Sequence, residues 1–226
     1  MNKKTLSIST IAVLAIVLLF VIEQFIQASY VVKTGLKVLL LLIIPLAWAF
    51  MYERSQISTI LGLRTFRSKE LLPGLLIGAG SFIIIIAAYA ILGPFIDFSN
   101  IAHNLETKLG INASNFLFVG LYVIFINSLL EEFFFRGFMF LNLKDRISVW
   151  TAYILSAGAF AIYHVAIIKG WFNPALMALA LLSLFVIGLV FNKLNSRSGH
   201  FLNSWIAHAM ADSAIILVGC RIFGIL

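Results

Sequence analysis

Charged residues are scarce in this chain of 226 residues, where only 11% are Asp, Glu, Lys or Arg and 62% are hydrophobic. A soluble domain carries about 25% charged residues, so the composition excludes a water-soluble globular protein. It also excludes a disordered chain, because disorder requires low hydrophobicity and high charge. With a mean hydropathy of +1.07, the sequence indicates one membrane domain whose solvent is the lipid bilayer.

Cysteine and acidic residues are also in short supply. The one cysteine, Cys220, has no intrachain partner, which excludes a disulfide framework, a CxxC redox pair and a cysteine-rich zinc site. Lys and Arg outnumber Asp and Glu by 16 to 9, but they stand singly at the ends of apolar runs, as at the edges of membrane spans. No basic stripe with exposed aromatic residues is present, so we expect no nucleic-acid partner.

Long uncharged stretches define the expected membrane spans. They cover residues 5–22, 38–52, 71–96, 109–130, 147–168, 170–192 and 198 onward, the last interrupted by Asp212 and Arg221. A helix needs about 20 residues to cross the bilayer core; the second stretch is shorter, but Lys37 can extend it by reaching to the interface. Segments such as FIIIIAAYAIL are apolar on every face, unlike barrel strands. We therefore predict an all-α, polytopic membrane helical bundle of about seven transmembrane helices, with eight as the alternative.

The chain is expected to divide by role within a single membrane domain. Residues 1–108 carry no chemical motif and are predicted to be scaffold helices, whereas residues 109–226 are predicted to form the catalytic core. Alternate connections hold ten basic residues on the side of the N-terminus and five on the other. By the positive-inside rule, the N-terminus is predicted to be cytoplasmic and the C-terminus external.

Adjacent glutamates interrupt the fourth apolar run, where an ionised side chain costs a few kcal/mol. Glu132 and Arg136 have the i, i+4 spacing of a helical ion pair, so we expect a structural pair. Glu131 lies about 100° around the helix from Glu132 and is left free for function. The run from 109 to 141 is too long for one straight span, so we expect it to tilt or break near the glutamates.

Two further polar groups lie in later spans. Ser156, Phe160 and His164 step by four residues along one helix face, and His208 and Asp212 share a face of another helix. If these faces converge on Glu131, they bring together a carboxylate base, two imidazoles and a second carboxylate, which suffices to activate a water.

The histidines also have structural interpretations. His164 alone could be a hydrogen-bonding contact between helices, and His208 lies near the end of its span, where an interfacial histidine is ordinary. His103 and His200 lie in predicted connections and have no motif of polar residues around them, so we expect both to be solvated.

The three motifs, Glu131-Glu132-x-x-x-Arg136, Phe160-x-x-x-His164 and His208-x-x-x-Asp212, resemble those of the CPBP family of intramembrane proteases. That family includes CAAX prenyl proteases and bacterial bacteriocin-processing and immunity proteins. The resemblance covers roughly residues 115–220.

The resemblance implies a role for each motif residue. Glu131 would be the general base that activates the attacking water, His164 would orient that water or polarise the scissile carbonyl, and Glu132 with Arg136 would hold the helix in place. His208 and Asp212 would stabilise the oxyanion. Asp212 replaces the commoner Asn, and because an ionised carboxylate only accepts hydrogen bonds, it could instead orient His208.

A metal is the alternative to a purely glutamate-driven reaction. Glu131, His164 and His208 could bind a divalent ion such as zinc and leave a position for water. The chain lacks an HExxH motif, so we assign no cofactor and favour the metal-free mechanism.

The expected function is an intramembrane endopeptidase, a hydrolase acting in the middle or cytoplasmic half of the bilayer. Its expected partners are the lipid bilayer and a peptide or protein substrate delivered at the membrane. The first alternative is a non-catalytic immunity or scaffold protein of the same family. A small proton-coupled transporter is the second, although no inverted repeat is visible.

Overall fold

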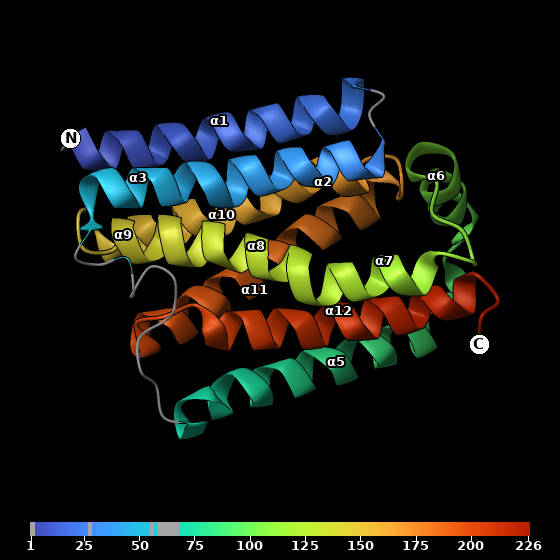
Figure 1. Ribbon diagram of the computed structural model, residues 1–226. Helices are drawn as coiled ribbons and strands as arrows, with labels where there is room; N and C mark the ends of the chain where they lie inside the picture. Colours follow the sequence, from blue (N-terminus) through green and yellow to red (C-terminus); the bar gives the residue numbers. More distant parts are fainter. Residues whose placement is uncertain (1–2, 27–28, 55–56, 58–67) are drawn as a thin grey trace.

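The computed structural model describes residues 3–26, 29–54, 57 and 68–226, and this part of the chain is helical without strands. The long helices lie side by side with roughly parallel axes (Figure 1). Within the described part, seven segments are long and apolar enough to cross a membrane: Lys3–Phe25, Tyr30–Tyr52, Lys69–Phe95, Phe116–Leu143, Val149–Ile168, Pro174–Ser198 and Leu202–Ile222. The predicted polytopic all-α bundle is confirmed.

The first two spans form the N-terminal layer. Helix α1 (Lys3–Phe25) is the first span, and α2 (Tyr30–Val38), the π-helical segment η1 (Leu39–Ile43) and α3 (Ile44–Tyr52) form the second. Pro45 lies in the first turn of α3, and because proline has no N–H to donate, the helical ladder changes pattern just before it. Most of the basic connection after α3, with Arg64 and Arg67, lies outside the described residues.

The third span lies at the edge of the bundle against the last one (Figure 1). It comprises η3 (Ser68–Leu71), α5 (Leu72–Leu92) and η4 (Gly93–Phe95), and it is followed by the short helix α6 (Ser99–Leu109). Gly74 and Gly78 of α5 face α12 (Leu202–Ile222); a Cβ atom at Gly74 would lie 2.6 Å from the Asn203 carbonyl oxygen. The two glycines therefore let α5 and α12 approach closely, as small residues four apart do in membrane helices.

The fourth span is wound unevenly. It consists of α7 (Phe116–Tyr122), η5 (Val123–Asn127), α8 (Ser128–Glu132), η6 (Phe133–Phe140) and α9 (Leu141–Leu143), and η5 and η6 are π-helical. Its backbone stays helical at the junctions, with φ −60° and ψ −38° at Ser128. Of the two predicted alternatives, a tilt or a break, the continuous helical backbone contradicts the break. Wider π turns lie on either side of α8, and such turns often occur at functional sites.

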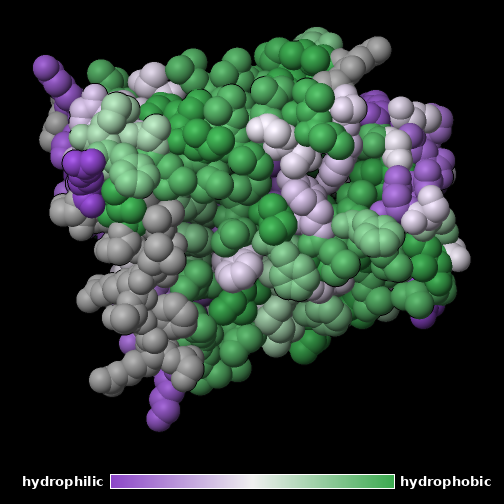
Figure 2. All heavy atoms as spheres, viewed as in Figure 1, coloured by the Kyte–Doolittle hydropathy of each residue, from purple (hydrophilic) through white to green (hydrophobic). Residues whose placement is uncertain are grey.

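The core of the bundle lies around η6. All eight of its residues are buried, and they pack against helices of the N-terminal layer and against α10 (Val149–Ile168) and α11 (Pro174–Ser198). The outer surface is largely hydrophobic, and the hydrophilic atoms gather at the two ends of the bundle (Figure 2). This distribution suits a protein surrounded by lipid along its middle and by water at both ends.

Candidate functional site

The three sequence motifs meet inside the bundle. Glu131 and Glu132 at the end of α8, His164 on α10 and His208 on α12 contact one another. The side chains are shielded from solvent: Glu131 is 1% exposed and Glu132 is fully buried. The helix faces that carry Glu131, His164 and His208 thus converge in the structure.

The two oxygens of Glu131 have different surroundings. Oε1 accepts hydrogen bonds from Asn127 Nδ2 at 2.8 Å and from the Tyr163 hydroxyl at 3.1 Å. Oε2 faces His164 Nε2 at 3.7 Å and His208 Nε2 at 3.9 Å. One oxygen is thus held by donors, and the other points between two imidazoles.

Glu132 joins two of the motifs. Its Oε1 accepts a hydrogen bond from Arg136 at 2.9 Å, the predicted i, i+4 ion pair, and lies 2.9 Å from His208 Nδ1. Because an ionised carboxylate only accepts, His208 Nδ1 carries the proton in this contact. The pair that was predicted to hold the helix therefore also fixes the orientation of His208.

Aromatic rings complete the surroundings of Arg136. Its guanidinium carbon lies 4.0 Å from the centroid of the Phe160 ring and 5.1 Å from that of Phe191. Stacking on ring faces satisfies a buried guanidinium where further acceptors are few. Phe160 thus supports the ion pair.

Phe160 and Ser156 position α10. His164 Nδ1 donates to the Phe160 carbonyl oxygen at 2.8 Å, which leaves Nε2 to face Glu131. Ser156 Oγ lies 2.9 Å from the Phe135 carbonyl oxygen and 3.1 Å from Asn192 Oδ1. Ser156 therefore joins α10 to η6 and α11, away from the glutamate and histidine side chains.

Asp212 lies beside His208, one turn along α12. Its Oδ2 is 3.7 Å from His208 Nε2 and is buried without a hydrogen-bond partner among the described residues. His208 consequently has a carboxylate near each ring nitrogen, Glu132 at Nδ1 and Asp212 at Nε2.

The residues do not fit a resident metal ion. Among the described residues, no group of three His, Cys, Asp or Glu side chains is arranged to hold one. In addition, the Lys37 ammonium lies 3.9 Å from Glu131 Oε1, and a positive charge at that distance competes with a cation for the carboxylate.

Three residues outside the sequence motifs also contact Glu131 in the structure. Asn127 lies four residues before Glu131, a spacing that could have indicated the contact, and Tyr163 is the neighbour of His164 in the sequence. Lys37 is distant from the motifs in the sequence, so no spacing indicated its contact with Glu131. It was expected to be able to reach the interface, but its Nζ instead lies 2.7 Å from Asn127 Oδ1, because the half-buried Asn127 amide and the buried Glu131 carboxylate offer it partners between the helices.

The other two histidines differ in their exposure to solvent. His103 is exposed, as predicted. His200, predicted to be solvated, is 1% exposed: its ring accepts a hydrogen bond from the Leu202 amide at 3.3 Å and thus supports the first turn of α12.

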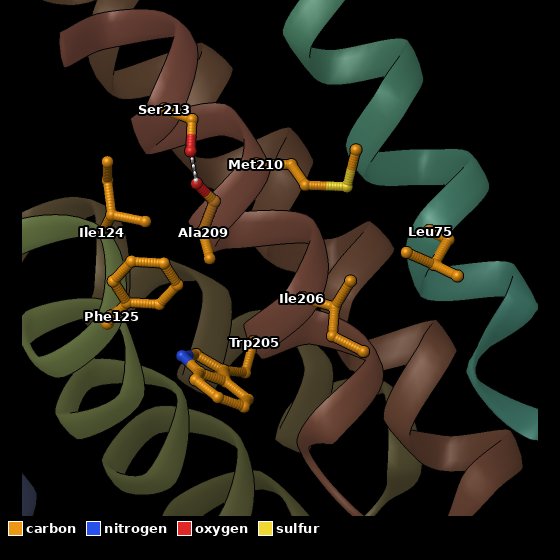
Figure 3. Close-up of a pocket in the computed structure, with 8 residues that line it drawn as sticks. All are labelled: Leu75, Ile124, Phe125, Trp205, Ile206, Ala209, Met210 and Ser213. Atoms are coloured by element: carbon orange, nitrogen blue, oxygen red, sulfur yellow. Dashed lines mark hydrogen bonds between the residues drawn. The ribbon is translucent and has the colours of Figure 1, made fainter. Parts of the chain in front are cut away.

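An apolar cavity of about 240 Å³ lies against the face of α12 that carries Ala209 and Ser213. It is lined by Leu75, Ile124, Phe125, Trp205, Ile206, Ala209, Met210 and Ser213 (Figure 3). Ala209 and Ser213 directly follow His208 and Asp212 in the sequence. The cavity therefore lies along the helix that carries two residues of the site.

Fold and site together define a polytopic helical membrane protein with a buried cluster of carboxylates and imidazoles. Residues 113–214, which hold all three motifs, match the family model described as type II CAAX prenyl endopeptidase, Rce1-like. The match agrees with the resemblance to the CAAX protease-like family that the motifs indicated. No curated protein and no solved structure matches the chain.

Proposed function

We propose that the protein is an intramembrane endopeptidase in which Glu131 activates a water molecule. The observation that carries this proposal is the difference in surroundings between the two oxygens of the Glu131 carboxylate. Asn127 and Tyr163 hold Oε1, while Oε2 lies 3.7 and 3.9 Å from the two imidazole nitrogens. These distances exceed those of direct hydrogen bonds and suit a bridging water.

The reaction follows from this placement. Glu131 Oε2 accepts a proton from the water while the water oxygen forms a bond to the carbonyl carbon of the peptide. His164 Nε2, with its proton on Nδ1, accepts the second water hydrogen and so orients the attack. The proton on Glu131 then passes to the amide nitrogen as the C–N bond breaks, which yields a carboxylic acid and an amine; the acid then passes its proton to the amine, which gives a carboxylate and an ammonium ion.

His208 is placed to stabilise the charge that develops on the carbonyl oxygen. A carboxylate near each of its ring nitrogens stabilises positive charge on the ring, and Nε2–H can then donate to the oxyanion. Asp212 serves this role by supporting His208, since its own carboxylate would repel an oxyanion.

The proposed substrate is a peptide or protein segment delivered at the membrane. Apolar residues line the cavity beside α12 (Figure 3), and such a cavity favours an apolar part of the substrate. We propose further that the N-terminus is cytoplasmic and that the reaction takes place in the middle or cytoplasmic half of the bilayer.

The proposal is tested by comparing wild type with Glu131→Gln and His164→Ala in a host that lacks the protein. Newly formed peptide termini in the membrane fraction are identified by mass spectrometry. Termini that depend on wild type should fall by about 10²–10⁴-fold in Glu131→Gln, the usual contribution of a general base. Glu106→Gln, an exposed carboxylate on α6, is the matched control and should behave as wild type.

Other outcomes identify the alternatives. Unchanged termini with an unchanged host phenotype in Glu131→Gln would favour the immunity or scaffold role over catalysis. Loss of the wild-type termini on treatment with a chelator, restored by added zinc, would contradict the metal-free reaction.

A further inference from the structure

Lys37 is an unexpected member of the site. It lies in the last turn of α2, outside the segment 113–214 that matches the family model. Only 14% of its side chain is exposed, and burying an ammonium is costly unless it is paired. Its position beside Glu131 therefore calls for an electrostatic explanation.

Lys37 also orients the amide of Asn127. An ammonium group only donates hydrogen bonds, so the amide oxygen of Asn127 must face Lys37 Nζ, at 2.7 Å. The amide nitrogen is thereby turned toward Glu131 Oε1, at 2.8 Å. Lys37 Nζ further lies 5.5 Å from the ring centroid of Tyr163, whose hydroxyl donates to the same oxygen.

Apart from His164, the other groups near Glu131 that can carry charge are negative or paired with other carboxylates. The His208 ring lies between Glu132 and Asp212. Arg136 is paired with Glu132, and Asp212 adds a second negative charge beside His208. Among the described residues, Lys37 is the one lysine or arginine within 4.0 Å of the Glu131 carboxylate.

We propose that Lys37 is a positioning residue for Glu131: it keeps the carboxylate ionised and, through Asn127, holds Oε1 so that Oε2 faces His164 and His208. This role rests on the proposed function, because an ionised, correctly turned Glu131 is what a general base requires. It also makes the N-terminal helices part of the catalytic machinery rather than a scaffold alone.

Lys33 provides a matched control within the same helix. It lies one turn earlier in α2, is 8% exposed, and pairs with Glu23 at 2.8 Å. Replacing either lysine by methionine removes one buried, paired ammonium from α2. Only the loss of Lys37 removes a charge from the surroundings of Glu131.

The first test measures the charge state of Glu131 without using peptidase activity. Dicyclohexylcarbodiimide modifies carboxyl groups in apolar surroundings when they are protonated, and the adduct is located by mass spectrometry of the purified protein. At neutral pH, Lys37→Met and Lys37→Gln should label at Glu131 at least about tenfold faster than wild type, since a unit charge about 4 Å away strongly favours the ionised form. Lys37→Arg and Lys33→Met should label as wild type does.

The second test measures turnover of the membrane peptide identified with the wild-type protein. Lys37→Met should lower kcat by at least about tenfold with little change in KM, and Lys37→Arg should restore much of the loss. Equal labelling of Glu131 in wild type and in both uncharged variants would overturn the proposal, whether or not hydrolysis is observed. Absence of hydrolysis by wild type would count against the proposed function alone, because the labelling result still decides the role of Lys37.

Discussion

Glu132 shows how one buried side chain can serve two parts of a site. The same oxygen accepts from Arg136 and lies 2.9 Å from His208 Nδ1. A buried ion pair does not by itself stabilise a fold strongly, because desolvation offsets the attraction. Its additional contact with a histidine on another helix gives the pair a second consequence, since it sets which nitrogen of His208 faces Glu131.

A second charged cluster closes one end of the bundle, at Glu53. Its side chain is contacted by Lys4 of α1, at 2.9 Å, and by Arg146 from the connection before α10. Burial alone would raise the pKa of Glu53, but the hydrogen bonds and charges of these two partners hold its pKa below the ordinary value. The cluster thus joins three segments that are distant in the sequence.

The cluster makes stability depend on pH in a defined direction. Because the pKa of Glu53 is lower in the folded than in the unfolded protein, its contribution is present above the ordinary glutamate pKa, about 4.3, and is lost as pH falls through the folded value. Glu53→Gln should therefore lower the Tm at pH 7, and the difference from wild type should shrink toward zero on acidification. Thermal unfolding in detergent measures it; a difference that grows at acid pH would contradict the assignment, and Glu106→Gln is the control.

At the scale of elements, close packing of α5 on α12 depends on two glycines. A Cβ atom at Gly78 would lie 3.1 Å from the Ala207 Cα and 2.6 Å from Met210 Sδ, whereas one at Gly80 would meet nothing within 4 Å. The contact also shapes the apolar cavity, which is lined by residues of both helices.

Gly74→Val is expected to push α5 away from α12, because the added side chain meets the backbone of Asn203. Overpacking of this kind costs about 1–3 kcal/mol, and the variant should show a lower Tm in detergent. Gly80→Val, on the same helix, should leave the Tm close to that of wild type. Equal effects of the two substitutions would show that close approach at Gly74 is not what holds α5 in place.

At the scale of the whole molecule, the hydrophilic ends and the hydrophobic middle (Figure 2) define an axis across the membrane but not its direction. The direction rests on the excess of basic residues in the connections on the side of the N-terminus. Cys220 is only 4% exposed, so we expect it to react little with a cysteine-labelling reagent.

Labelling of single introduced cysteines tests the topology. Asp145, in the connection after α9, and Glu106, on α6, are both exposed, and α9 and α6 lie at opposite ends of the bundle (Figure 1). In intact cells, Glu106→Cys should react with a membrane-impermeant maleimide, while Asp145→Cys should react only after permeabilisation. The reverse pattern would place the N-terminus outside, and wild type should remain unlabelled in both conditions.

The sequence by itself determined the features that depend on composition and on spacing along one helix. Low charge and long apolar runs dictate membrane helices, since only such segments are stable in lipid. The i, i+4 spacing dictated the pairing of Glu132 with Arg136, because residues four apart share a helix face. The polar motifs were recognisable because ionisable residues are rare in such spans.

Tertiary structure decided which side chains from different helices meet. Lys37 is long enough to reach either the interface or the interior, and only the packing of the second span against the fourth decided that it meets Asn127 and Glu131. The contact between His208 and Glu132 likewise depends on how α12 is rotated against α8. Helix rotation and register arise from the packing of the whole bundle, which no local pattern in the sequence specifies.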